Sequence, residues 1–165
     1  MKNFVRIKQG LDISPLLYAV SKLQTSEDTM EVLRLRLPES DGATECISQP
    51  VLQELSEAIP YIFGLMSLVR GERLGTVLLT LVKPGGRILP HADMKGMDKY
   101  YDRFHIVLQS NPEVLFRAGD ERVYMAAGEV WWFDHTVEHE VQNHGTCNRI
   151  HLIVDIKLGV YNARA

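Results

Sequence analysis

The strongest pattern in the chain is Thr80-Leu81-Val82-Lys83-Pro84-Gly85-Gly86-Arg87-Ile88-Leu89-Pro90-His91-Ala92-Asp93. An apolar strand meets a Pro-Gly-Gly turn, and a short return strand then ends in a histidine and an aspartate. Residues i and i+2 of an extended strand point to the same face, so we expect His91 and Asp93 to converge. These two side chains can therefore bind one metal ion.

Short apolar segments separated by turn residues continue from Gly75 onward. Asn111-Pro112 and Asn143-His144-Gly145 are examples of the turn signals between them. About eight short strands in roughly eighty residues are typical of a double-stranded β-helix, the jelly-roll or cupin-like barrel, whose mouth suits a metal and a small ligand. The pattern predicts a mainly β fold with strands near 76–83, 87–93, 102–109, 113–117, 121–126, 129–134, 137–143 and 148–157.

The region before Gly75 has a mixed α/β pattern. Ser14-Pro15 predicts a helix start, with serine as N-cap and proline at the first helical position. Leucines alternate with arginines from Leu33 to Leu37, as in a half-exposed strand. A second helical pattern opens at Ser48-Gln49-Pro50, and we expect Pro60 to break or kink it before an apolar helical run. We expect these flanking N-terminal helices to cover the outside of a sheet.

The length of 165 residues predicts one domain over 1–165. We expect residues 1–74 to form an α/β support region and residues 75–160 to form the jelly-roll catalytic core. The hydrophobic fraction of 45% and charged fraction of 24% are those of an ordinary globular protein. The net charge of -3 gives no footprint for nucleic acid or an anionic membrane, so we expect neither partner.

The N-terminal stretch Met1–Arg6 opens no apolar core of signal-peptide length, and no window of the sequence reaches the length of a membrane span. The two cysteines, Cys46 and Cys147, are too few for a disulfide framework or a cysteine-ligated zinc site. We therefore expect a cytoplasmic, reduced setting, which also favours ferrous iron. The sequence does not indicate an oligomeric state.

His139 lies in a later expected strand, and strands two and seven of a jelly roll are neighbours across the barrel mouth. Two histidines and one carboxylate form the ligand set of a non-haem Fe(II) oxygenase. By itself, the tripeptide His91-Ala92-Asp93 is weak evidence for a metal site, because a surface histidine and a loop aspartate give the same pattern more often. The hypothesis depends on the three residues meeting at one site.

Arg149 opens the strongly apolar segment Arg149–Ile156. An arginine that faces a barrel interior needs an anion, because an unpaired buried charge is very costly. The partner could be Asp155 or a glutamate of the chain itself, or the side chain could lie on the outer face. Alternatively, the guanidinium could bind the carboxylate of a co-substrate with two parallel hydrogen bonds.

Arg103 and His105 share one face of another expected strand. That face could be the polar outside of an edge strand, or it could point inward, close to the metal, and bind a second carboxylate. In the second case Phe104, Ile106 and Leu108 would point to the other side. His151 shares a face with Arg149 and is either a pocket residue or a hydrogen-bonded core histidine.

The segment from Thr80 to Asp155 resembles the aspartyl/asparaginyl β-hydroxylase family of Fe(II)- and 2-oxoglutarate-dependent dioxygenases. The resemblance covers roughly the C-terminal half of the chain, and the order and spacing of its motifs agree. Each motif alone is weak, and together they are fairly specific. They are the Pro-Gly turn before Pro90-His91, Arg103-x-His105, Gly128-Glu129 before Phe133-Asp134, Glu138-His139-Glu140-Val141, and Arg149 running into Ile153-Val154-Asp155.

The resemblance implies that His91 and His139 are the two imidazole ligands of iron. Asp93 varies within the family: some members, including the animal enzymes that hydroxylate Asp and Asn in proteins, lack a carboxylate here. Similar bacterial amino-acid hydroxylases have one. Asp93 therefore favours a complete metal-binding triad, and it disfavours the animal substrate.

The resemblance also implies a co-substrate site. Arg149 would bind the distal carboxylate of 2-oxoglutarate, helped by the Thr80 hydroxyl. Arg103 and His105 would contact the carboxylate nearest the keto group.

The function expected from these features is hydroxylation of a C–H bond, with Fe(II), 2-oxoglutarate and O2 as cofactors and co-substrates. The substrate would be an amino acid, a peptidyl residue or a related small metabolite, and succinate and CO2 would be released. One alternative is a cupin-type metalloenzyme that does not use 2-oxoglutarate. Another is a non-catalytic barrel that binds an anion or peptide through Arg103 and Arg149.

Overall fold

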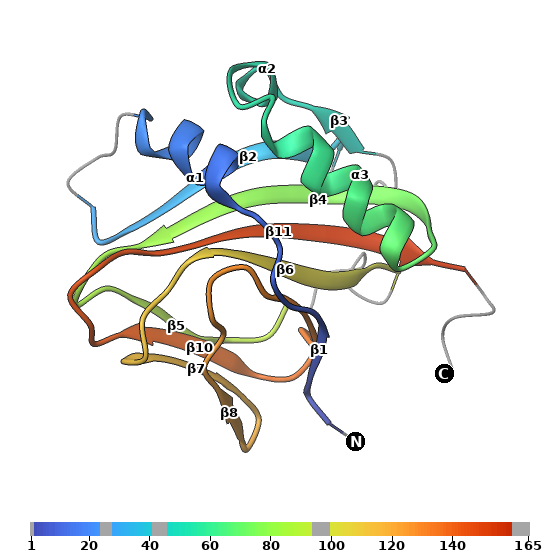
Figure 1. Cartoon of the computed structure of the whole chain (residues 1–165). Coiled ribbons are helices and arrows are strands. Elements are labelled where there is room, and N and C mark those ends of the chain that lie inside the picture. Colours follow the sequence, from blue (N-terminus) through green and yellow to red (C-terminus); the bar gives the residue numbers. More distant parts are fainter. Residues whose placement is uncertain (1, 24–27, 41–45, 94–99, 160–165) are drawn as a thin grey trace.

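The computed structural model describes residues 2–23, 28–40, 46–93 and 100–159. Two antiparallel sheets face each other, and three helices cover the outer face of the larger one (Figure 1). The fold is the mainly β, jelly-roll-like barrel with flanking helices that the sequence predicts.

Both sheets are built from strands that are distant in sequence. The larger sheet has the order β1-β9-β6-β11-β4-β2-β3, and the smaller sheet has the order β5-β10-β7-β8. The strands are β1 (Phe4–Lys8), β2 (Met30–Pro38), β3 (Cys46–Ser48), β4 (Gly71–Val82), β5 (Arg87–His91), β6 (Asp102–Gln109), β7 (Val114–Ala118), β8 (Glu121–Val123), β9 (Val130–Phe133), β10 (His139–Asn143) and β11 (Arg149–Leu158).

Each strand predicted from Gly75 onward is present, as β4 to β11. The main difference is that β4 begins at Gly71, because its first residues pair with the end of β11, Leu158 opposite Gly71. The first part of the chain also joins the larger sheet, since β1 pairs with β9 and β2 pairs with β4. The division into a support region 1–74 and a core 75–160 stays a prediction.

Alternation along the strands of the larger sheet separates two apolar layers. On β6, Phe104, Ile106 and Leu108 belong to the layer beneath the helices, as predicted for an inward-facing Arg103 and His105. Val107 belongs instead to the layer between the two sheets. The period of two thus places Arg103 and His105 inside the barrel.

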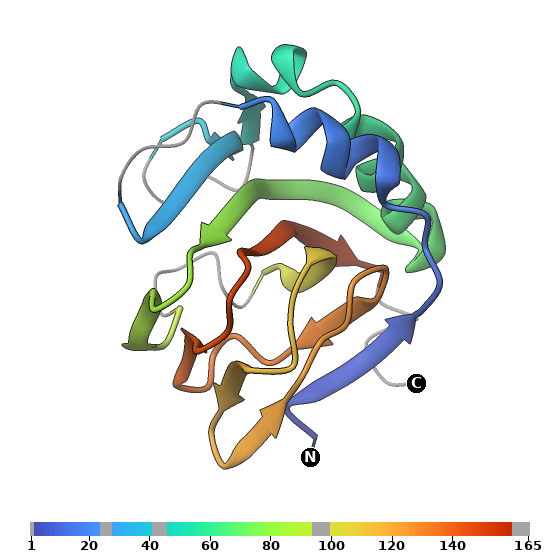
Figure 2. The same ribbon diagram turned by 60° about the vertical axis from the view of Figure 1, so that its left-hand side comes forward.

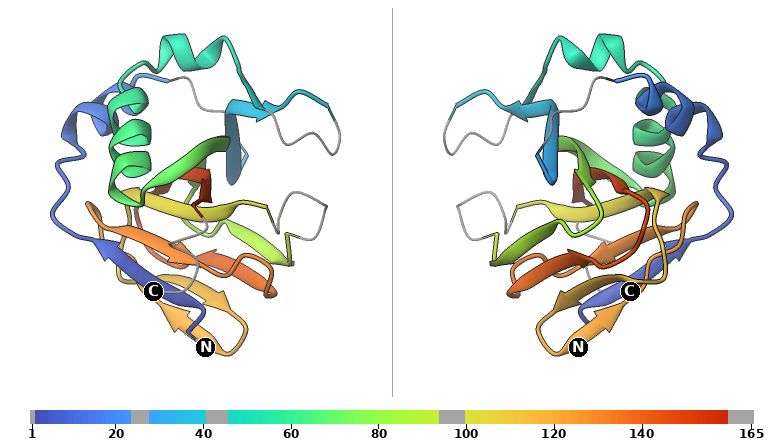
Figure 3. Two further views of the ribbon diagram at one scale, coloured as in Figure 1. Left: turned by 90° about the vertical axis from the view of Figure 1, so that its right-hand side faces the viewer. Right: turned by 90° about the vertical axis from the view of Figure 1, so that its left-hand side faces the viewer.

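The helices α1 (Ser14–Ser21), α2 (Val51–Glu54) and α3 (Ala58–Leu68) lie on the outer face of the larger sheet (Figures 2 and 3). The N-cap of α1 is Ile13 rather than Ser14, although Pro15 lies in the first turn as predicted. Pro60 does not break a helix. It lies in the first turn of α3, where a backbone N–H has no helical partner to lose.

The turn Pro84-Gly85-Gly86 carries the chain from the larger to the smaller sheet. Gly85 has a φ of 76°, which favours glycine. A Cβ on Gly86 would lie 2.5 Å from the carbonyl oxygen of Thr29, so this position also requires glycine. Backbone hydrogen bonds join both glycines to Asn143 at the end of β10. The turn therefore fixes β5, and with it His91, beside β10.

Among the described residues, no helix is long and apolar enough to cross a membrane.

Candidate metal centre and its pocket

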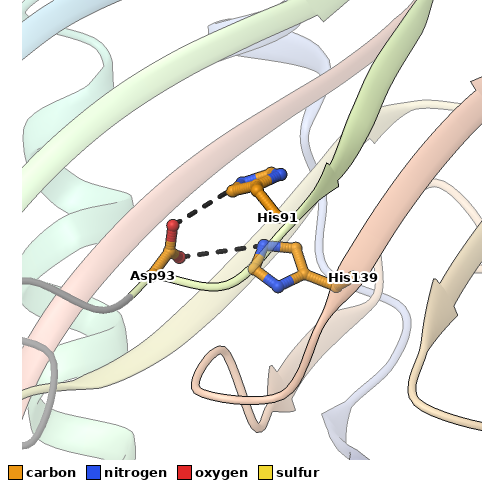
Figure 4. A group of neighbouring side chains, drawn as sticks. All are labelled: His91, Asp93 and His139. Carbon is orange, nitrogen blue, oxygen red and sulfur yellow. Dashed lines mark ion pairs between the residues drawn. The ribbon is translucent and has the colours of Figure 1, made fainter.

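His91, Asp93 and His139 meet at one end of the smaller sheet (Figure 4). His91 is the last residue of β5 and stands opposite His139, the first residue of β10. The two rings have centroids 4.3 Å apart, and one potential ligand atom from each of the three residues lies within 4.8 Å of the other two. Asp93 follows β5, and its backbone N–H donates to the carbonyl of His135. The geometry suits one metal ion held by three side chains.

Both imidazoles are oriented to present Nε2. Nδ1 of His91 lies 2.7 Å from the carbonyl oxygen of Leu89, and Nδ1 of His139 lies 2.9 Å from that of Val137. A carbonyl oxygen only accepts, so each Nδ1 carries the proton and each Nε2 keeps a lone pair. The Nε2 atoms lie 3.6 and 3.8 Å from the Asp93 carboxylate oxygens. Burial lowers the pKa of His139, which favours the neutral form that binds metals.

A cavity of about 250 Å³ extends from this group into the space between the sheets. All seven residues predicted from the sequence to form the site line it. They are Thr80, His91, Asp93, Arg103, His105, His139 and Arg149. Other lining residues come from β2, among them Met30 and Val32. This contribution of β2 was not predicted from the sequence, although alternation opposite the buried Leu35 could have indicated it.

Arg149 is buried inside the barrel, with 1% of the residue exposed. Its Nη1 donates to the Thr80 hydroxyl over 3.2 Å, and its guanidinium lies 5.7 Å from the ring centroid of Phe116. Among the described residues, no carboxylate forms an ion pair with Arg149, and its Nε has no hydrogen-bond partner. Burial lowers its pKa to about 9. Because a buried charge without a counter-ion is costly, binding of an anion by this guanidinium is energetically favourable.

His105 lies beside Arg149 and is held in one tautomer. Its Nδ1 is 3.5 Å from Nη2 of Arg149, which can only donate, and 3.0 Å from Nδ1 of His151. His105 therefore accepts at Nδ1 and carries its proton on Nε2, and His151 donates. Burial, reinforced by the Arg149 charge, lowers the pKa of His105 well below its ordinary value. Its Nε2 is buried and has no hydrogen-bond partner among the described residues. His105 therefore offers an unsatisfied N–H donor at the cavity.

Arg103 points inward, but its guanidinium already binds two carboxylates. It pairs with Asp155 on β11 and with Asp93 at the metal centre. From the sequence, Asp155 was one candidate partner of Arg149. Asp155 pairs with Arg103 instead because strand register sets these two residues opposite each other. His151 does not line the cavity; it is a buried, hydrogen-bonded residue behind His105.

The fold is that of a jelly-roll protein whose His-Asp-His group could hold a metal ion, and comparison with known proteins identifies its family. The family model for aspartyl/asparaginyl β-hydroxylase matches residues 31–158. The chain belongs to this family.

Curated relatives include two bacterial enzymes. The chain is 28% identical over 134 residues to an L-proline cis-4-hydroxylase of Rhizobium meliloti, covering 76% of this chain and 46% of that protein. It is 29% identical over 105 residues to an L-proline cis-3-hydroxylase of a Streptomyces species, covering 61% of this chain and 36% of that protein. The chain thus spans less than half the length of these curated relatives.

Solved structures share the fold. An oxidoreductase of the 2OG-Fe(II) oxygenase family from Burkholderia pseudomallei matches with a TM-score of 0.67 and 13% identity, covering 94% of this chain and 84% of that one. The viral collagen prolyl hydroxylase of Paramecium Bursaria Chlorella virus-1 matches with a TM-score of 0.58 and 11% identity, covering 96% and 97%. At these identities the likeness concerns the fold.

Proposed function

We propose that the protein is an Fe(II)- and 2-oxoglutarate-dependent hydroxylase of an amino acid or related small metabolite. The observation that carries the proposal is one cavity lined by His91, Asp93 and His139 together with the buried Arg149. Membership of the aspartyl/asparaginyl β-hydroxylase family supports it. A cytoplasmic setting stays a prediction.

Fe(II) would be held by Nε2 of His91, Nε2 of His139 and the Asp93 carboxylate. This donor set leaves coordination positions for other ligands, as in the 2-His-1-carboxylate oxygenases. When bound, Fe(II) with 2-oxoglutarate and O2 supplies the oxidation: 2-oxoglutarate becomes succinate and CO2, one oxygen atom entering succinate and the other the substrate. The chain's own contribution is to orient the ligands and to exclude water.

The buried donors of the cavity suit a dicarboxylate. Within the described part of the chain, Nε of Arg149 and Nε2 of His105 have no hydrogen-bond partner, and Arg149 has a hydroxyl neighbour in Thr80. A carboxylate bound there would accept charge-assisted hydrogen bonds in surroundings of low dielectric, where such bonds are strong. We assign the distal carboxylate of 2-oxoglutarate to Arg149 and Thr80. Contacts of Arg103 and His105 with the carboxylate nearest the keto group stay a prediction.

The substrate would approach past the apolar walls of the cavity. Met30, Val32, Ile88 and Val141 line it, and they suit the C–H bonds of an aliphatic group better than a charged one. The relatives named L-proline hydroxylases make L-proline the first substrate to test. Residues 1–74 would then support the core and contribute part of this wall through β2.

The test is turnover of 2-oxoglutarate in the presence of Fe(II) and a panel of free amino acids, starting with L-proline. We expect succinate and a hydroxylated amino acid in equal amounts. Oxygen-dependent turnover without succinate would favour the cupin-type alternative. Anion binding with neither metal binding nor oxygen consumption would favour the non-catalytic barrel.

A further inference from the structure

A continuous row of charged side chains runs from β11 to the metal centre. Asp155 accepts two hydrogen bonds from Arg103, with Oδ1 2.7 Å from Nε and Oδ2 2.8 Å from Nη2. The same guanidinium donates from Nη1 to Oδ2 of Asp93 over 2.5 Å. The three side chains are only 9% to 18% exposed, so water screens their charges weakly.

The guanidinium of Arg103 is held in place by its pairing with Asp155. The two residues stand opposite each other on the neighbouring strands β6 and β11. Two parallel hydrogen bonds between a guanidinium and a carboxylate allow essentially one relative orientation. Asp93 is anchored separately, by its backbone N–H on the carbonyl of His135. The contact from Arg103 therefore orients the Asp93 carboxylate from a rigid sheet.

Without Asp155, the charge of Arg103 would oppose metal binding. A guanidinium beside Asp93 repels a divalent cation bound to that carboxylate and competes for its oxygen atoms. Asp155 supplies the compensating negative charge, so that Arg103 and Asp155 together add no net charge. The negative charge of Asp93 then remains available to the metal.

We propose that Asp155 is a positioning residue of the metal centre. Acting through Arg103, it orients Asp93 and preserves the charge of that carboxylate for the cation. The inference rests on the metal-binding role proposed above for Asp93, and it assigns a function to a residue that is not among the described residues lining the cavity.

A purely structural ion pair predicts a different result. If the contact between Asp155 and Arg103 only joined β11 to β6, its loss would lower the free energy of unfolding and leave the metal affinity of the folded protein unchanged. If Asp155 positions Asp93, its loss weakens metal binding in a protein that is still folded.

The experiment is a calorimetric titration of the metal-free protein with Co(II), without 2-oxoglutarate or oxygen. For Asp155→Asn we expect the dissociation constant for Co(II) to rise about 10- to 100-fold, the usual effect of removing a group that orients a metal ligand. The visible spectrum of the Co(II)-saturated variant should also differ from that of the wild type. Asp155→Glu, which keeps the charge, should recover most of the affinity.

Asp102→Asn is the matched control, because it removes the same charge from β6, the strand that pairs with the strand of Asp155. Asp102 accepts a hydrogen bond from Trp132 on the opposite face of the sheet, and its loss should leave Co(II) affinity at the wild-type value. Equal affinities for Asp155→Asn and Asp102→Asn would overturn the inference.

Should Asp155→Asn fail to fold, Arg103→Lys gives the same comparison: weakened Co(II) binding supports the inference, and unchanged binding refutes it. Failure of the wild type to bind Co(II) would instead remove the proposed function.

Discussion

Arg149 and Thr80 meet inside the barrel, with Nη1 3.2 Å from the hydroxyl oxygen, although 69 residues separate them in the chain. They lie on the neighbouring strands β11 and β4, so the sheet itself fixes their relationship. The guanidinium is thus oriented before any anion binds. Preorganisation of this kind reduces the entropy lost when a ligand is bound.

Arg149→Lys should weaken 2-oxoglutarate binding about 10- to 100-fold, because lysine keeps the charge and loses the planar fork. The dissociation constant can be measured calorimetrically with Mn(II) in place of Fe(II). Arg117→Lys is the control, since Arg117 pairs with Glu138 and Glu140 on the outside of the smaller sheet. An unchanged constant for Arg149→Lys would show that the co-substrate binds elsewhere.

Thr80→Val removes one hydroxyl with little change of shape and leaves Nη1 of Arg149 without its partner. We expect the KM for 2-oxoglutarate to rise about 3- to 10-fold, the usual contribution of one such hydrogen bond. Thr80→Ser keeps the hydroxyl and should stay close to the wild type. If Thr80→Val and Thr80→Ser had the same KM for 2-oxoglutarate, the Thr80 hydroxyl would have no part in binding the co-substrate.

His139→Ala should abolish turnover and weaken metal binding by more than the roughly 10- to 100-fold typical of losing an outer partner. The bound metal can be counted after dialysis by elemental analysis. The exposed His144, whose Nε2 lies beside the side chain of Gln142, provides the control variant His144→Ala. Stoichiometric iron in His139→Ala would remove this residue from the ligand set.

The stability of the metal-free protein should decrease as the pH falls below about 6.5. Burial lowers the pKa of both His105 and His151 well below 6.5, so the unfolded chain binds protons that the folded chain does not. Each histidine then costs about 1.4 kcal/mol per pH unit between the unfolded and the folded pKa. Urea denaturation at several pH values measures this slope. A flat profile between about pH 7 and pH 5 would contradict the buried neutral pair.

Much of the barrel follows from local patterns. Alternating apolar residues and glycine turns are sufficient to predict β4 to β11, because register and side-chain direction depend on a period of two. The same rule predicts that Arg103 and His105 share one face of β6, although only the structure shows that this face is the interior one. The convergence of His91 with His139 needed the jelly-roll topology as well, since no local pattern specifies that β5 pairs with β10.

The partners of the charged residues could not be read from the sequence. Asp155 pairs with Arg103 rather than Arg149 because β11 aligns it opposite Arg103, and that register depends on the whole sheet. The helix boundaries in the structure also differ from those predicted from the sequence. Pro60 is compatible with the first turn of α3, and the sequence alone did not locate where that helix begins.

Fe(II) and 2-oxoglutarate should bind together in the one cavity between the two sheets. The decisive measurement is an anaerobic titration of the protein with both, followed by visible absorbance. We expect a charge-transfer band that requires both components, saturates at one equivalent and is lost in His139→Ala. Absence of the band in wild-type protein that binds each component separately would contradict this expectation.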